Sequence, residues 1–167
     1  MPSTIGADSL HTSASPIPQA TARRFLIYVG KAVPAGSRKG GYGLGIDPGD
    51  VLFRRLGDHV ASIQAARNLD LADFGCRYLL VDDIWIPLGE SLLIEKFKPV
   101  WNICVDGFGH HDQGKSRRGQ MKSAWDTLHP GRAWAENVEQ PNPKSADEIA
   151  QTVIAFLDEY ATAKAET

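Results

Sequence analysis

Runs of apolar residues predict two strands in the first half of the chain. Residues 23–32 contain the unbroken run "FLIYV", in which aromatic and β-branched side chains favour a buried extended segment. Residues 76–82, "CRYLLVD", have the same character and predict a second strand. The first run reaches its end at Tyr28, Gly30 and Lys31. A core strand that ends in a phenol and an ammonium group needs an explanation.

Helical periodicity predicts helices downstream of these strands. Residues 51–68 repeat leucine, valine and isoleucine at helical spacing, and the preceding Asp50 suits an N-cap. Residues 86–99 predict a short apolar helix that Pro99 ends, with Glu90 in its first turn.

Glycine, proline and small polar residues separate these elements. Residues 1–24 lack periodicity and predict a flexible arm, and the glycine-dense residues 34–50 predict a long loop that matches no phosphate-binding pattern. Residues 145–148, "SADE", form a capping box before an amphipathic helix. We therefore expect one domain at residues 25–135, with the acidic helix of residues 136–167 packed on it.

The composition is that of an ordinary globular protein. The length of 167 residues fits one compact domain, and 43% hydrophobic with 23% charged residues excludes disordered and fibrous classes. No apolar run is long enough to span a membrane, and the N-terminal residues lack the pattern of a secretory signal. The two cysteines are too few for a disulfide framework. We expect a cytoplasmic protein without a membrane partner.

The charge is unevenly distributed, which changes the picture given by a net charge of −2. Up to residue 135 the chain has 16 lysine and arginine residues and 13 aspartate and glutamate residues. Residues 136–167 have 2 basic and 7 acidic residues. Residues 21–41 and 114–122 are basic stretches of the kind that contact phosphates, although solvated surface charges fit them equally well.

Six polar residues stand where apolar ones are expected or at the ends of predicted elements. A guanidinium can stabilise the charge that develops when a phosphodiester is hydrolysed. One carboxylate suffices for Mg²⁺, and a phenol or imidazole can deprotonate the attacking water. Each residue taken alone also fits an ordinary structural role. The six are Tyr28, Lys31, Arg55, His59, Glu90 and Asn102.

These residues lie in blocks that resemble the GIY-YIG nuclease superfamily. "IYVGKA" resembles the second half of its motif, with Val29 in place of the usual isoleucine. "LFRRLGDHVASI" resembles its helix with arginine and histidine, and "LGESLLIEKFKPVWN" resembles its glutamate helix and terminal asparagine. The blocks "NLDLADFGCRYLLVDDIWIPLGE", "DGFGHHDQG" and "WDTLHPGRAWA" resemble the type II restriction endonucleases of this fold that cut a GC-rich palindrome.

The resemblance implies an α+β fold, in which helices flank a small antiparallel GIY-YIG-type sheet that carries DNA-binding insertions and a C-terminal amphipathic helix. It implies Mg²⁺-dependent hydrolysis of double-stranded DNA, with Mn²⁺ as a substitute ion. The implied roles are contact with the nucleophilic water for Tyr28, transition-state stabilisation for Arg55, proton transfer for His59, metal binding for Glu90, support for Asn102 and phosphate contact for Lys31.

The resemblance also implies how DNA is bound. A palindromic target is read by a two-fold homodimer. The candidates for backbone or major-groove contacts are Arg38, Lys39, Lys115, Arg117, Arg118 and Gln120.

The first half of the motif, a strand with its own tyrosine, is expected upstream of residue 25 and is not found there. Residues 3–24 resemble the linker that normally follows that strand. An alternative function is therefore a catalytically impaired DNA-binding protein of the same fold. Both functions predict salt-sensitive DNA binding, and only the nuclease predicts cleavage. A third interpretation, a metal site at His110, His111 and Asp112, is less favoured than a polar loop.

Overall fold

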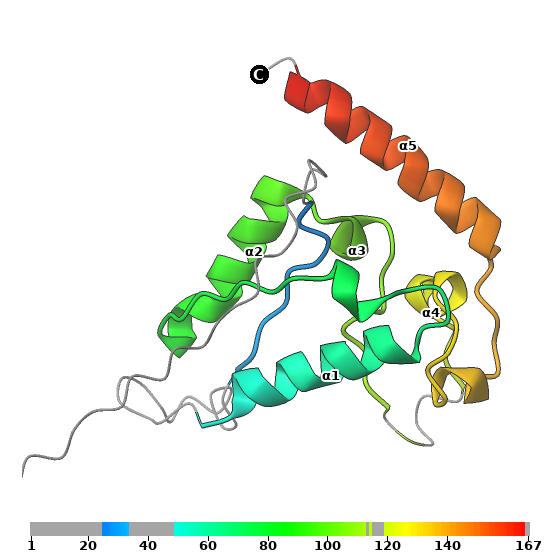
Figure 1. The fold of residues 1–167 in the computed structure, drawn as a ribbon, viewed down its shortest axis with the longest axis horizontal. Coiled ribbons are helices and arrows are strands. Elements are labelled where there is room, and N and C mark those ends of the chain that lie inside the picture. The colour runs from blue at the N-terminus through cyan, green and yellow to red at the C-terminus, as the bar shows by residue number, and fades with distance from the viewer. Residues whose placement is uncertain (1–24, 34–48, 113, 115–118, 166–167) are drawn as a thin grey trace, which may run out of the picture.

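The computed structural model describes residues 25–33, 49–112, 114 and 119–165, and these form a helical body (Figure 1). The predicted arm and most of the predicted loop at residues 34–50 lie outside this part of the chain. The described elements are α1 (Val51–Ala65), η2 (Leu71–Asp73), η3 (Asp83–Trp85), α2 (Ile86–Phe97), α3 (Val100–Ile103), α4 (Ala124–Leu128), η5 (Ala135–Asn137) and α5 (Ala146–Ala165).

The predicted antiparallel sheet was wrong for the described residues. Residues 25–33 and 74–82 belong to neither helix nor strand, and the β-bridge that is present joins Met121 to Gln140. A run of apolar and β-branched residues favours extended backbone, but a strand forms only where a neighbour pairs with its N–H and C=O groups. No such neighbour lies beside either segment within the described part of the chain.

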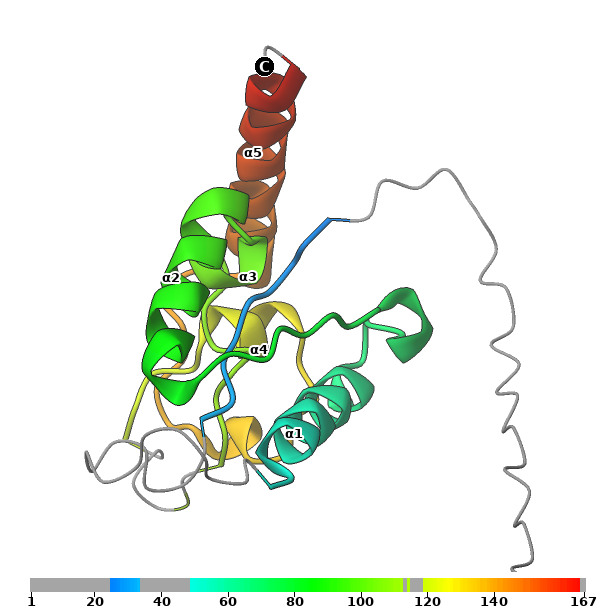
Figure 2. The ribbon, with the colours of Figure 1, turned by 90° about the vertical axis from the view of Figure 1, so that its left-hand side faces the viewer.

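Residues 25–33 instead receive their hydrogen bonds from α3. They pass between α1 and α2 (Figure 2). The Val29 N–H donates to Asn102 Oδ1 at 2.8 Å, and Asn102 Nδ2 donates back to the Val29 carbonyl at 2.8 Å. The Trp101 N–H donates to the Ile27 carbonyl at 2.9 Å. One side-chain amide and one helical N–H therefore take the place of a sheet neighbour.

Within the described part of the chain, residues 74–82 make only local backbone hydrogen bonds, at their two ends. Tyr78, Leu79 and Leu80 are 69%, 70% and 74% exposed, and the following Ile84 and Trp85 are also largely exposed. The apolar character that predicted a buried strand is thus present on the surface of the described structure.

Helices α1 and α2 lie close to the predicted positions. Asp50 precedes α1, but its carboxylate caps no N–H group and pairs with Arg54 at 2.7 Å. Helix α2 stops before Pro99, with Lys98 in the left-handed region at φ 45°. Glu90 is the fifth residue of α2, so the expected position in the first turn was wrong. A favourable interaction with the N-terminus of α2 therefore does not explain why a carboxylate occurs at this position.

The capping box before α5 is confirmed. The Ser145 N–H donates to Glu148 Oε2 at 2.7 Å, and the Glu148 N–H donates to Ser145 Oγ at 3.3 Å. The helix contacts α3 and α4 near its start, where Ile149 is buried, and then extends away from the body (Figure 1). Among the described residues, no helix combines the length and apolarity that crossing a membrane requires.

An aromatic core joins these helices. Trp101 of α3 and Trp125 of α4 meet edge to face at 5.8 Å between ring centroids, and Phe108 lies 4.6 Å from Trp101 and 5.4 Å from Trp125. Ile63 and Ile149 bring α1 and α5 to the same cluster. Because Asn102 directly follows Trp101, the core fixes the amide that holds the extended segment.

We expect Asn102→Asp to destabilise the protein. The substitution keeps the shape of the side chain but replaces the amide donor with an acceptor that faces the Val29 carbonyl. The free energy of unfolding should fall by about 1–3 kcal/mol, measured by urea denaturation. Asn137→Asp is the matched control, because Asn137 is exposed and its amide bonds only the nearby Ala133 carbonyl. Equal losses in the two variants would contradict the special role of Asn102.

Candidate active site

Tyr28 lies between two glycines. A Cβ atom at Gly30 would come within 2.6 Å of the Tyr28 ring, and one at Gly109 would come within 2.6 Å of the Tyr28 hydroxyl. Any side chain at either position would displace the phenol. The glycine of "YVGKA" therefore permits the tyrosine to fold back beside its own backbone, with its hydroxyl facing α1.

Arg55 reaches this hydroxyl from α1. Its Nη2 donates to the Tyr28 hydroxyl oxygen at 3.4 Å, and its Nη1 donates to the Gly109 carbonyl at 3.3 Å. The Arg55 Nε is buried and has no hydrogen-bond partner among the described residues. Because Arg55 also lines an open cavity beside the phenol, its guanidinium is suited to binding an additional oxygen there, such as that of a phosphate.

His59 lies one turn further along α1 and is held by aromatic contacts. Its ring stacks on Phe108 at 4.6 Å and 16°, and meets Tyr28 edge-on at 5.2 Å. Burial and then the neighbouring Arg55 guanidinium lower the pKa of His59 from 6.5 to about 4. The imidazole is therefore neutral near pH 7, and the same two effects disfavour its protonated form.

His111, which the sequence singled out only for a less favoured metal site, lies beside Arg55, and this contact was not predicted. Its Nε2 contacts Arg55 Nη1, and its Nδ1 lies 3.6 Å from Asp58 Oδ2. Because arginine only donates, the contact requires Nε2 to be the acceptor, which leaves the proton on Nδ1 facing Asp58. The less favoured metal site at residues 110–112 has no support here, since the described residues contain no cluster of three or more metal-ligating side chains. His111 lies more than 50 positions from Arg55 and Asp58 in the chain, so no local sequence pattern indicated these contacts.

Lys31 and Glu90 form an ion pair. Lys31 Nζ lies 2.6 Å from Glu90 Oε2, and the side chains are 37% and 21% exposed. A partly buried, hard carboxylate that already faces a positive charge is a suitable ligand for Mg²⁺ or Mn²⁺, which keep several of their waters. A single carboxylate provides too few ligands for a structural zinc site. Glu90 is thus the one carboxylate here that could hold the divalent ion that the sequence implied, and no cluster of three or more metal-ligating side chains surrounds it among the described residues.

A cavity of about 320 Å³ opens beside Tyr28 and Arg55. The structure thus brings Tyr28, Arg55 and Asn102 to one cavity and sets His59 directly behind Tyr28. The Lys31–Glu90 pair begins three residues further along the same extended segment. The residues lining the cavity are Tyr28, Arg55, Trp101, Asn102, Asp106, Gly107, Phe108, Gly109 and His110.

The predicted DNA-contact residues are mostly outside the described structure. Gln120 is described and exposed, close to the bridge between Met121 and Gln140. The others fall on residues that are not described, namely Arg38, Lys39, Lys115, Arg117 and Arg118.

The chain matches the family model of the Eco29kI GIY-YIG domain over residues 5–157. The fold and site therefore belong to a GIY-YIG nuclease domain, a class whose substrate is DNA. Within that class the chain belongs to the Eco29kI GIY-YIG domain family, which is a family of type II restriction endonucleases. This confirms the resemblance seen in the sequence. A comparison with curated proteins found no match.

We expect the stability to fall in acid because of two histidines. The pKa values of His59 and His129 are lowered from 6.5 to about 4, chiefly by burial. The unfolded chain binds more protons than the folded one below pH 6.5, so this contribution is complete above that pH and is lost as the pH falls toward 4. Each histidine contributes at most about 1.4 kcal/mol per pH unit, and less where water screens it.

Urea unfolding across this pH range measures the effect. The double variant His59→Gln, His129→Gln should show a flatter dependence of the free energy of unfolding on pH than the wild type. Identical slopes in the two proteins would show that neither histidine is held neutral by folding.

Proposed function

We propose that the protein is a Mg²⁺-dependent restriction endonuclease that hydrolyses double-stranded DNA at a short GC-rich palindrome as a homodimer. The observation that carries this proposal is the contact between the Arg55 guanidinium and the Tyr28 hydroxyl at the edge of an open cavity. Membership of a type II restriction endonuclease family supports it.

The side chains suit the parts of a hydrolytic reaction on a phosphodiester. In the proposed reaction, water attacks the phosphorus and the bond to the leaving oxygen breaks. Tyr28 orients the attacking water, while Arg55 stabilises the negative charge that builds on the phosphate oxygens. His59, which is neutral near pH 7, accepts or relays the proton that the water loses.

Glu90 is the residue that would hold the divalent ion, Mg²⁺ or its substitute Mn²⁺. When bound, this ion supplies positive charge to the phosphate. Lys31 pairs with Glu90 at 2.6 Å. We propose that in the complex with DNA Lys31 would also contact a neighbouring phosphate. Asn102 keeps Tyr28 and Lys31 in place through its two bonds to Val29.

We expect purified protein to nick or linearise plasmid DNA when Mg²⁺ is added. Arg55→Ala should lower kcat by about 10²–10³-fold, because it removes a donor aimed at developing charge. Glu90→Gln should reduce the cleavage rate in the presence of Mg²⁺ to the rate measured without the ion, because the variant lacks the proposed metal ligand. Arg54→Ala is the matched control, since Arg54 neighbours Arg55 on α1 but pairs with Asp50 at the surface. Gel electrophoresis of the plasmid over time gives the rates.

The outcomes separate the nuclease from its alternative. Uncut DNA at micromolar protein, together with binding whose log affinity falls linearly with log salt, would identify a catalytically impaired DNA-binding protein. Equal losses in the Arg54 and Arg55 variants would reject the proposed role of Arg55.

We expect the active form to be a dimer on its target. A palindrome presents the same half-site twice, and two-fold symmetry lets one chain read each half. Sedimentation equilibrium with and without a cognate duplex measures the mass. A strict monomer on the cleaved duplex would contradict paired cutting, whereas non-cognate DNA serves as the control for non-specific assembly.

A further inference from the structure

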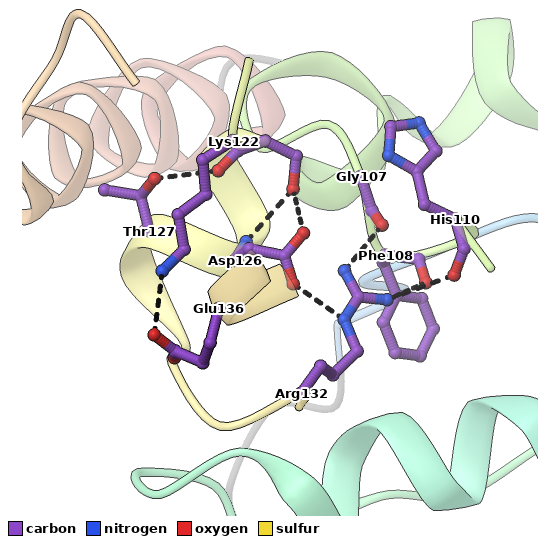
Figure 3. Close-up of polar contacts among 9 residues, drawn as sticks. Gly107, Phe108, His110, Lys122, Asp126, Thr127, Arg132 and Glu136 are labelled. Atoms are coloured by element: carbon purple, nitrogen blue, oxygen red, sulfur yellow. Dashed lines mark hydrogen bonds and ion pairs between the residues drawn. The ribbon is translucent and has the colours of Figure 1, made fainter. Parts of the chain in front are cut away.

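A buried arginine outside the residues discussed so far holds the turn of residues 107–110. Arg132 is only 3% exposed. Its Nη2 donates to the Gly107 carbonyl at 2.9 Å, and its Nη1 donates to the Phe108 and His110 carbonyls, both at 3.2 Å (Figure 3). One planar guanidinium therefore donates hydrogen bonds to three of the four carbonyl groups of this turn.

The charge of Arg132 is neutralised where it lies. Its Nε donates to Asp126 Oδ1 at 2.7 Å, and Asp126 is also 3% exposed. The guanidinium lies over the rings of Trp125 and Trp134, at 4.3 and 4.7 Å from their centroids. Because it is buried, paired and stacked, Arg132 is not a residue that could contact a DNA phosphate directly.

The fourth carbonyl of the turn, that of Gly109, is hydrogen-bonded to Arg55. The Gly109 carbonyl accepts from Arg55 Nη1 at 3.3 Å. The Phe108 side chain from the same turn stacks on His59 at 4.6 Å and meets Tyr28 edge to face at 4.9 Å. Three of the residues to which the reaction is assigned, Arg55, His59 and Tyr28, therefore contact this turn.

We propose that Arg132 is a positioning residue for the nuclease reaction, which fixes the turn of residues 107–110 so that Arg55, His59 and Tyr28 keep their reactive arrangement. This proposal rests on the proposed function. It requires an arginine rather than any cation, because a lysine could pair with Asp126 but its single ammonium group cannot reproduce the planar fork that spans three carbonyls.

The variant Arg132→Lys tests this geometry. We expect kcat to fall by about 10- to 100-fold, as for a small misplacement of catalytic groups. KM and the Kd for the plasmid substrate should stay within about threefold of the wild-type values, because the buried Arg132 is not placed to contact a phosphate. The His110 amide, which donates to the Gly107 carbonyl at 3.0 Å, should exchange with deuterium faster than in the wild type.

Glu136→Gln is the matched control. Glu136 lies next to the same group of residues and pairs with Lys122 at 3.6 Å rather than with the turn (Figure 3). It should leave both kcat and the exchange of the His110 amide unchanged. A residue with only a general structural role would lower the melting temperature without changing kcat well below that temperature.

Each outcome decides the proposal. Wild-type kcat or wild-type exchange of the His110 amide in Arg132→Lys would overturn it. Should that variant fail to fold, the double variant Arg132→Met, Asp126→Asn removes both buried charges, and the same two measurements apply to it. If the wild type cuts no DNA, the proposed function fails, whereas faster exchange of the His110 amide still establishes that Arg132 holds the turn.

Discussion

The arrangement of the site depends on how the backbone of residues 25–33 is hydrogen-bonded, since no strand among the described residues lies beside it. An extended apolar segment cannot be buried with its N–H and C=O groups unpaired. The Asn102 amide meets both polar groups of Val29, and α3 supplies a further N–H to Ile27. Tyr28 and Lys31 lie on either side of the held residue, so their positions follow from this one amide.

Two arginines contact the turn of residues 107–110, and the partners of their guanidinium groups differ. Arg132 is surrounded by three carbonyls, a carboxylate and two indole rings, which leave it no capacity for a ligand. Arg55 has one turn carbonyl, a phenol and an imidazole, and its Nε has no partner among the described residues. The first arrangement favours a structural role, and the second favours binding an anion.

Helices and local signals were largely predictable from the sequence. The helix predicted at residues 51–68 was found as α1, with Arg55 and His59 four positions apart on it, and the capping box fixed the start of α5. The predicted sheet was wrong because the same apolar runs favour extended backbone whether or not a neighbour is present to pair with it. The start of α2 at residue 86 was predicted correctly, but Glu90 is its fifth residue and lies just beyond the first turn in which it was expected.

The sequence alone determined which chemical groups are available and to which family they belong, because the motif "YVGKA" and the blocks after it are local patterns. Only the tertiary structure decided which of these groups meet. The contacts of Asn102 with Val29, of His111 with Arg55 and of Arg132 with Gly107 join residues 73, 56 and 25 positions apart. Such contacts depend on how helices pack around Trp101 and Trp125, and that packing leaves no periodic trace in the chain.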